Sequence, residues 1–232
     1  MPDGAAVKRM FSGISPRYDL LNRLLSLGID RAWRRRTVAA LRNGAGEGPS
    51  PALDLCCGTG DLSLAMAAGG FAVTGLDFCH EMLVIGRAKV RGAGSSGVRM
   101  AEGDALCLPF RDRSFSAAAV AFGLRNLQSL EQGLAEMSRV LESGGRLAIL
   151  EFGRPRGRLL PLVYRVYLNA WVPLVGRLLS GDGQAYAYLA SSIQAFPHTS
   201  IVKDHLARAG FTSVTAEPLT SGIATLYLGT KR

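Results

Sequence analysis

The sequence of 232 residues has few of the side chains that bind metals or form disulfides. It contains four cysteines and three histidines, and no C-x-x-C pair occurs among them. The adjacent pair Cys56–Cys57 is a poor chelator, because successive side chains along an extended chain point to opposite sides. The histidines show no ligand spacing with the cysteines. We therefore expect no bound metal and no redox centre, and interpret the cysteines as small apolar residues that suit close packing.

Long uninterrupted apolar segments are also missing. The least polar region, residues 159–179, is interrupted by Arg165, Asn169, Pro173 and Arg177. Because a transmembrane helix needs roughly 20 mostly apolar residues, this region is expected to pack on the protein or to lie on a membrane surface. The N-terminal stretch MPDGAAVKRMFSG has an early acid and no apolar core, so we expect no secretory signal. These features predict a cytoplasmic protein, with a peripheral contact at the inner face of the membrane.

Acidic residues are fewer than basic ones, 18 against 27, which gives a formal charge of +9. Such a charge favours anionic partners such as nucleic acid or a membrane surface. Aromatic residues make up only 7% of the chain, few for base stacking, and no appended RNA-binding module is recognisable. We therefore expect no nucleic-acid partner. The hydrophobic content of 48% is typical of a folded globular chain.

From residue 52 onward, short apolar runs alternate with helical patterns. Five strands are predicted, at residues 52–57, 71–77, 98–105, 115–123 and 146–152. Runs such as AAAVAF, apolar on both faces, are typical of strands buried between helices in a parallel sheet. This alternation predicts a doubly wound α/β fold. The last part is expected to add an antiparallel edge, from a helix at 201–210 and strands at 212–220 and 224–231.

Two regions lie outside this core. Residues 1–43 form a predicted N-terminal helical arm, with Trp33 and the basic run Arg34–Arg36. Residues 155–200 form a predicted helical insertion or lid between the fifth strand and the last helix. We interpret residues 1–232 as a single domain, whose remaining parts are the ligand-binding core at 51–153 and the C-terminal helix and edge strands at 201–232.

The turn after the first strand, LDLCCGTGD, indicates what binds at the strand ends. A dinucleotide site requires G-x-G-x-x-G, but Ser63 stands at the third glycine position, and no lysine follows as in a phosphate-binding loop. Gly58, Thr59 and Gly60 remain, and glycine at such a turn lets the backbone approach a ligand closely. We therefore expect these three residues to bind a ligand at the carboxyl end of the first strand.

Acidic residues follow the next two strands. Asp77 ends the second strand, where a carboxylate can accept hydrogen bonds from both ribose hydroxyls of an adenosine. Asp104, with the N–H of Ala105 beside it, follows the third strand and can contact an adenine edge. Since these loops meet at one edge of a parallel sheet, the set predicts a nucleoside cofactor without a pyrophosphate, namely S-adenosylmethionine. The alternative for each acid taken singly is a solvated strand end.

Several longer motifs resemble the UbiE/MenG family of quinone-biosynthesis C-methyltransferases. They are YDLLNRLLSLGIDRAW (18–33), LDLCCGTGD (53–61), FGLRN (122–126), RVLESGGRLAILEF (139–152) and AYAYLASSIQAFP (185–197). The resemblance covers nearly the whole chain. It implies a class I S-adenosylmethionine-dependent methyltransferase fold, Rossmann-like, with a seven-stranded, mostly parallel sheet and an antiparallel edge.

The reaction that the resemblance implies is methylation of a ring carbon of a polyprenylated hydroquinone, converting demethylmenaquinol to menaquinol. Four alternatives stay open: the benzoquinol of the ubiquinone pathway, another small molecule, an RNA substrate, and a binding protein that keeps the nucleoside pocket without catalysis. The naphthoquinol is preferred because the chain is short and lacks an organelle-targeting extension.

The resemblance places family cofactor contacts on Thr59, Asp77 and the Asp104–Ala105 pair. The chain also departs from the family pattern. Ala121 stands where a serine is common, and Asp30 stands where the arm motif usually has histidine. The remaining departures are Gly153 for a common serine and Glu142–Ser143 for the usual Lys-Pro.

Carbon methylation of a phenolic ring requires loss of the phenolic proton, which makes the adjacent carbon electron-rich. A phenol ionises near pH ~10, so the site must favour the phenolate, without a metal or a covalent nucleophile. Arg125 can hold a phenolate by a charge-assisted bond or orient a water that removes the proton, and Asn126 can supply a neutral donor. Tyr18, in the arm, is the third predicted catalytic residue. The alternatives are a surface salt bridge for Arg125 and ordinary packing for Tyr18.

Other polar residues have open interpretations. Asp61 is either the N-cap of the first core helix or a contact for the cofactor's amino group, and Asp54 braces the loop. The insertion is expected to form a channel for a prenyl tail, since each buried CH₂ contributes about 0.8 kcal/mol; a lid packed on the core is the alternative. The expected channel residues are Leu159, Leu160, Leu162, Val163, Val166, Leu168 and Trp171, with Arg165 and Arg177 directed toward anionic headgroups.

Overall fold

A computed structural model describes residues 4–43, 48–171 and 183–232. One sheet runs through the described part of the chain, with strand order β3-β2-β1-β4-β5-β7-β6. Its strands are β1 (Ser50–Leu55), β2 (Phe71–Asp77), β3 (Val98–Glu102), β4 (Phe115–Ala121), β5 (Leu141–Phe152), β6 (Phe211–Leu219) and β7 (Ala224–Lys231).

The five strands from β3 to β5 are parallel, and β7 pairs antiparallel with both β5 and β6. Leu55, the last residue of β1, is in register with Leu76 of β2 and Val120 of β4. The carboxyl ends of these three strands therefore lie at the same level. The α/β fold class, with a mostly parallel seven-stranded sheet and an antiparallel edge, is confirmed.

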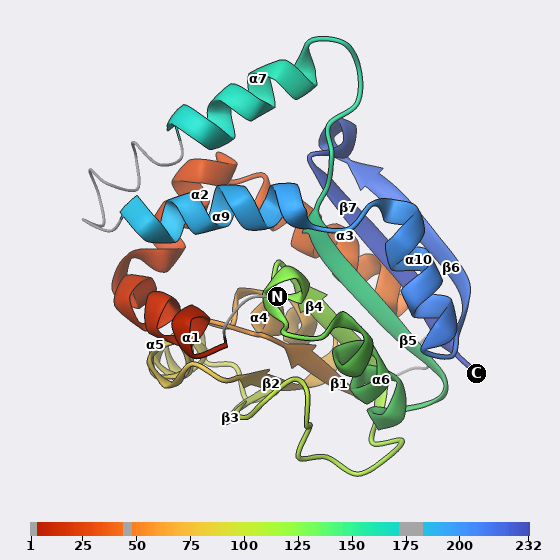
Figure 1. Cartoon of the computed structure of the whole chain (residues 1–232). Helices are drawn as coiled ribbons and strands as arrows, with labels where there is room; N and C mark the ends of the chain where they lie inside the picture. The colour runs from red at the N-terminus through yellow and green to blue at the C-terminus, as the bar shows by residue number, and fades with distance from the viewer. Residues whose placement is uncertain (1–3, 44–47, 172–182) are drawn as a thin grey trace.

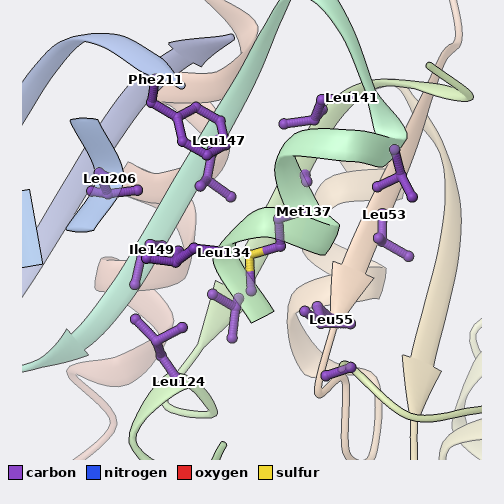
Figure 2. Close-up of a cluster of buried hydrophobic side chains, with 14 of the residues drawn as sticks. Leu53, Leu55, Leu124, Leu134, Met137, Leu141, Leu147, Ile149, Leu206 and Phe211 are labelled. Carbon is purple, nitrogen blue, oxygen red and sulfur yellow. The ribbon is translucent and has the colours of Figure 1, made fainter. Parts of the chain in front are cut away.

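The sheet is buried on both faces, because alternate residues of each strand point to opposite sides. Leu53 and Leu55 pack in one cluster with α6 (Leu130–Val140) and α10 (Thr199–Arg208). Figure 2 shows this cluster, in which Leu134 and Met137 of α6 lie between β1 and β5. The residues of the opposite face pack with α3 (Asp30–Arg42), α4 (Asp61–Ala68) and α5 (His80–Gly92).

The predicted arm consists of three helices. α1 (Gly4–Ile14) is followed by the 3₁₀ turn η1 (Ser15–Arg17), α2 (Tyr18–Ser26) and α3. The insertion contains α7 (Leu160–Val166), the π-helical turn η3 (Tyr167–Trp171) and α9 (Gly183–Ala195). In Figure 1, α1, α2, α7 and α9 gather on one side of the sheet, away from α10 and the β6–β7 edge.

A separate apolar cluster joins the arm to the insertion. Ile14 of the arm packs with Met82 of α5, Leu168 of η3 and Ile193 of α9. The arm and the insertion, which are distant in sequence, therefore pack together above the strand ends. Two 3₁₀ turns, η2 (Leu124–Asn126) and η4 (Thr220–Gly222), complete the described elements.

The first, third and fourth strands end earlier than predicted, and the fifth begins earlier, at Leu141. β1 ends at Leu55 because Cys56 takes a left-handed conformation, with φ of 54°, and opens the glycine turn. β3 ends at Glu102, and Asp104 instead forms an isolated bridge with Cys107. Arg177 lies outside the described residues. Among the described helices, none combines the length and the apolar character needed to cross a bilayer.

Candidate active site

Two neighbouring cavities lie at the carboxyl end of the parallel strands. The strand-end cavity, of about 360 Å³, is lined by the loops that follow β1, β2, β3 and β4 and by residues of α1. The apolar cavity, of about 300 Å³, is lined by α1, α2, α3, α7, η3 and α9. Phe11, Tyr18 and Phe122 line both. The two cavities therefore meet at a wall of three aromatic residues.

Gly58 and Asp77 are hydrogen-bonded neighbours in the lining of the strand-end cavity. The Gly58 N–H donates to Asp77 Oδ2 at 2.8 Å, and the Cys79 N–H donates to Oδ1 at 2.9 Å. Burial raises the pKa of Asp77 above its usual range, and these two backbone bonds oppose the rise. Gly58 has φ of 54°, which favours glycine, and it borders the cavity. Each Asp77 oxygen retains acceptor capacity for a bound hydroxyl.

The predicted adenine contact also lies at this cavity. Asp104 and Ala105 both line it, Asp104 exposed and Ala105 buried. Asp104 Oδ1 accepts from the Leu106 N–H at 2.8 Å, which holds the tight turn after β3. Ala121, at the position where serine is common, lines the cavity without a polar side-chain atom.

Thr59 and Gly60 are not among the residues that line the strand-end cavity. The Thr59 hydroxyl donates to Asp19 Oδ1 at 2.6 Å and accepts from Lys89 Nζ at 3.1 Å. Thr59 thus ties the glycine turn to α2 and α5. Gly60, with φ of 83°, is the residue before α4, and a Cβ there would lie 3.2 Å from Met100 Cε. Its position therefore demands glycine for backbone reasons.

A cluster of charges surrounds Thr59. Lys89 Nζ is 2.8 Å from Asp19 Oδ2 and also forms a close ion pair with Asp61. Burial acts to raise the pKa of Asp61, but the hydrogen bond and charge of Lys89 outweigh it and lower that pKa. Because Gly60 occupies the cap position of α4, the structure places Asp61 in this ionic cluster and not at the N-cap. The arm and the glycine turn are joined by these contacts.

Asp30, which replaces the usual histidine, is buried at the apolar cavity. It accepts from Ser26 Oγ at 2.7 Å and forms a close ion pair with Arg34. Arg34 Nη1 also lies 3.9 Å from Asp61 Oδ2. The departure at Asp30 therefore comes with a cationic partner one helical turn away. Gly153, another departure, has no room for a side chain, since a Cβ would lie 2.5 Å from the Gly222 carbonyl oxygen.

Asp54 is a buried carboxyl under the glycine turn. It is 1% exposed, and Ser63 Oγ of α4 donates to its Oδ2 at 2.5 Å. Burial raises the pKa of Asp54 to about 7. A small cavity of about 30 Å³, which Tyr18 also lines, borders this carboxyl. The contact with Ser63 links β1 to α4, as expected of a residue that braces the loop.

Tyr18 stands where the cavities meet. It lines the strand-end cavity, the apolar cavity and the small cavity beside Asp54. Burial raises the pKa of Tyr18, while a hydrogen bond with Asn22 and the charges of Arg125 and Arg34 oppose the rise. The phenol therefore keeps its proton at neutral pH and can act as a hydrogen-bond donor.

Arg125 lines the apolar cavity and is buried in an ion pair. Its Nη1 lies 2.8 Å from Oε1 of the fully buried Glu151, and its guanidinium lies 5.2 Å from the Phe152 ring centre. Its Nε is buried and has no hydrogen-bond partner among the described residues. A surface salt bridge is therefore the wrong description of Arg125. An unpaired buried donor is costly, and Arg125 carries this one at the edge of the apolar cavity.

Asn126 lines the strand-end cavity, on the other side of the wall from Arg125. Its Oδ1 accepts from the Tyr188 hydroxyl of α9 at 3.1 Å. The amide N–H groups are then the part of this side chain that can donate to a bound molecule. The three predicted catalytic residues are thus distributed around the junction of the two cavities.

The insertion residues divide into two groups. Leu160, Val163 and Leu168 line the apolar cavity, as expected for a channel. Leu159, Leu162, Val166 and Trp171 do not line it, and each is more than half exposed. The expectation that all seven line one channel is therefore wrong, because α7 turns its other face to the solvent.

Several residues of the site had no role assigned from the sequence. Phe11 and Lys8 line the strand-end cavity from α1, and Lys89 joins the glycine turn to Asp19, which lies inside the motif at 18–33. Glu151 had one recognisable signal, a single acid ending the apolar run LAIL, where a buried charge requires a partner. Among the described residues, no group of three or more His, Cys, Asp or Glu is arranged to hold a metal ion.

Comparisons with known proteins give a consistent family match. The model of the ubiE/COQ5 methyltransferase family matches residues 2–231. A curated relative named demethylmenaquinone methyltransferase, from Thermus thermophilus, is 49% identical over 222 residues, covering 95% of this chain and 99% of the relative. A protein of Geobacter sulfurreducens named ubiquinone/menaquinone biosynthesis C-methyltransferase UbiE is 42% identical over 232 residues, covering 98% and 89%.

Solved structures share the fold at low identity. The crystal structure of the [4+2]-cyclase SpnF superposes with a TM-score of 0.71 at 18% identity, covering 100% of this chain and 97% of that one. A SAM-dependent methyltransferase from Aquifex aeolicus has a TM-score of 0.61 at 15% identity, covering 84% and 89%. At these identities the likeness concerns the fold alone, and one fold serves different reactions.

The buried carboxyl of Asp54 predicts a measurable pH dependence. With a pKa of about 7 when folded and about 3.9 when unfolded, it stays protonated in the folded state while the unfolded chain releases the proton. Rising pH therefore favours unfolding. In urea titrations, the free energy of unfolding of the wild type should fall between pH 5 and pH 8. That of Asp54→Asn should fall by less, and the difference should be on the order of 2 kcal/mol. Asp204→Asn, at an exposed position, is the control, and identical pH dependence of all three proteins would refute this assignment.

The ionic cluster predicts that Asp19→Asn loosens the arm without unfolding the core. Loss of a partly buried pair worth about 1 kcal/mol should speed amide hydrogen exchange of α2 roughly fivefold, with β1 and β4 unchanged. Arg36→Ala breaks an exposed pair between the arm and Glu217 and serves as the matched control. Equal exchange in α2 for Asp19→Asn and Arg36→Ala would contradict the role assigned to the cluster.

Proposed function

The chain belongs to the ubiE/COQ5 methyltransferase family, and we propose that this methyltransferase transfers a methyl group from S-adenosylmethionine to a ring carbon of a polyprenylated quinol. The proposed reaction converts demethylmenaquinol to menaquinol. The relative from Thermus thermophilus, named demethylmenaquinone methyltransferase, is 49% identical over nearly the full length of both chains, which supports this choice.

The arrangement of the two cavities is the observation that carries the proposal. A cavity at the strand ends, which contains the acids Asp77 and Asp104, and an apolar cavity under the arm and insertion share the wall of Phe11, Tyr18 and Phe122. Methyl transfer needs the donor and the acceptor carbon held in line at short distance. Adjacent cavities with a common wall suit a polar cofactor in the strand-end cavity and a hydrophobic acceptor in the apolar cavity.

The strand-end cavity fits the cofactor by its donor and acceptor set. Asp77 offers carboxylate oxygens to the ribose hydroxyls, and Gly58 leaves the cavity open because it carries no side chain. Asp104 and Ala105 flank the place for the adenine. Thr59 and Gly60 shape the turn from outside the cavity. When bound, the cofactor supplies an electrophilic methyl group on a sulfonium.

The acceptor ring is assigned to the apolar cavity beside Arg125 and Tyr18. The Arg125 guanidinium lines this cavity, and its positive charge favours the phenolate form of a ring bound there. Tyr18 keeps its proton and donates a hydrogen bond. Asn126 donates from the neighbouring cavity. Glu151 holds the guanidinium in place and does not line either cavity.

The prenyl tail is assigned to the part of the apolar cavity between the arm and the insertion. Met10, Leu160, Val163 and Leu168 line this part. Removing an apolar tail from water is favourable in proportion to the area buried. A substrate of this kind resides in lipid, so the proposal places the protein in the cytoplasm, in peripheral contact with the inner face of the membrane.

The benzoquinol of the ubiquinone pathway is the second candidate substrate. The relative from Geobacter sulfurreducens, whose name covers both ubiquinone and menaquinone biosynthesis, is 42% identical. Both rings require the same carbon methylation. Lipid analysis of a deletion strain separates them, since demethylmenaquinone should accumulate if the naphthoquinol is the substrate. Normal quinones in that strain would contradict the proposal.

We expect the carboxylate of Asp77 to strengthen cofactor binding. Asp77→Ala removes the acceptor for the ribose and leaves the Gly58 and Cys79 N–H groups unpaired. Because hydrogen bonds to charged groups contribute about 1.5–3 kcal/mol, titration calorimetry should show S-adenosylmethionine binding at least ~10-fold weaker. Glu131→Gln, at an exposed position of α6, is the control. Equal affinity of Asp77→Ala and wild type would remove the cofactor assignment.

We expect substitution of Arg125 to slow the methyl-transfer step. Arg125→Lys keeps the charge beside Glu151 but loses the Nε–H and the planar guanidinium. We expect kcat for the quinol to fall by roughly 10- to 100-fold, the equivalent of one charge-assisted hydrogen bond. The affinity for S-adenosylmethionine should stay the same, because Arg125 does not line the strand-end cavity. An unchanged kcat would show that Arg125 acts only as a structural partner of Glu151.

A further inference from the structure

The outer face of α7 is an exposed apolar surface. Figure 1 shows α7 at the outer edge of the molecule, beyond α9 as seen from the sheet. None of its residues is buried. Five apolar side chains of α7 and its flanks are exposed, namely Leu159 (75%), Leu162 (51%), Val163 (61%), Val166 (59%) and Trp171 (54%). Single exposed apolar residues are ordinary, but a group of this size on one helix indicates a contact surface.

The charge around this surface has one sign. Between Phe152 and Trp171 the sequence has four arginines and neither aspartate nor glutamate. Arg154, Arg156, Arg158 and Arg165 are all exposed. An apolar helical face bordered by arginine is the pattern of helices that lie in the interface of an anionic bilayer.

The same surface borders the entrance of the apolar cavity. Leu160 and Val163 of α7 line that cavity, and Val163 is at the same time exposed. Leu27 and Ile29, between α2 and α3, also line the cavity and are 84% and 38% exposed. Two exposed apolar edges, one on α7 and one between α2 and α3, therefore border the apolar cavity.

We propose that the outer face of α7, together with the Leu27–Ile29 corner, docks on a bilayer that contains anionic lipid, and that the quinol enters the apolar cavity sideways from the hydrocarbon. This inference rests on the proposed quinol substrate. The exposed apolar side chains insert at the boundary between headgroups and acyl chains, and the arginines contact lipid phosphates. The prenyl tail then moves from lipid into the cavity without crossing water.

The charge pattern favours a bilayer over a second copy of the chain. A contact between two copies of this surface would bring together two arginine-rich segments without an acid in either to pair the charges. Anionic headgroups supply the missing negative charge. A second copy remains an outcome of the test, recognisable as a dimer that forms in the absence of lipid.

Binding is measured by sedimentation with vesicles of phosphatidylcholine, with and without 30% phosphatidylglycerol. The proposal expects binding to the anionic vesicles at least tenfold stronger than to neutral ones. The double variant Leu162→Ser/Val166→Ser should bind at least tenfold more weakly, because both side chains are exposed and neither lines the cavity. The matched control is Val84→Ser/Ile201→Ser, which removes exposed apolar residues from α5 and α10 and should bind like the wild type.

Tryptophan fluorescence locates the contact. The chain has two tryptophans, of which Trp33 is buried and Trp171 is exposed. Anionic vesicles should shift the emission to shorter wavelength, and Trp171→Phe should abolish the shift. A shift that persists in Trp171→Phe, or vesicle binding unaffected by Leu162→Ser/Val166→Ser, would overturn the assignment of this surface.

The route of the quinol is tested by comparing two substrates. Leu162→Ser/Val166→Ser should lose at least tenfold in kcat/KM for a long-chain quinol carried in anionic vesicles. It should keep the wild-type rate with a short-chain quinol dissolved in buffer. Equal loss with both substrates, or with neither, would refute entry from the bilayer. If the wild type methylates neither quinol, the proposed function fails, whereas the vesicle and fluorescence measurements still decide the docking surface.

Discussion

The contact between the arm and the glycine turn is the constraint on which the site depends. Asp19 of α2 is held by the Thr59 hydroxyl at 2.6 Å and by Lys89 at 2.8 Å. Tyr18, the residue before Asp19, lines every cavity of the site. The pair of contacts therefore positions the wall between the strand-end cavity and the apolar cavity. Since misplacement of reacting groups by about 1 Å can cost roughly 100-fold in rate, a small ionic cluster outside the strand-end cavity controls the geometry inside it.

Burial of polar groups gives the site its electrostatic character. The Arg125–Glu151 pair is almost fully removed from solvent, and Asp54 and Asp77 are both buried below the strand ends. In such surroundings a charge without a partner is costly and a charge aimed at a ligand is strong. Burial raises the pKa of Tyr18, so its phenol stays protonated, and Arg125 supplies a guanidinium cation. One cation and one neutral donor thus line the apolar cavity that we propose for the acceptor ring.

The sheet and its strand-end residues were predictable from the sequence, because each rests on a local pattern. Apolar runs marked the strands, and Gly58, Asp77 and Asp104 followed from their positions after consecutive strands. Contacts between distant segments were not predictable. Thr59 was expected to face a ligand, but its hydroxyl meets Asp19, 40 positions away, and Lys89, 30 positions away. The division of α7 into a packed face and an exposed face was also not predictable, because an apolar sequence does not say which side packs.

The most direct test follows the methyl group itself. The purified protein is incubated with S-adenosylmethionine labelled in the methyl group and with demethylmenaquinol in vesicles, and the lipid extract is analysed by mass spectrometry. We expect one labelled methyl group on a ring carbon of the quinol, and no label in the extract when either substrate is omitted. A lipid extract without label, under conditions in which the protein binds the cofactor, would contradict the central claim.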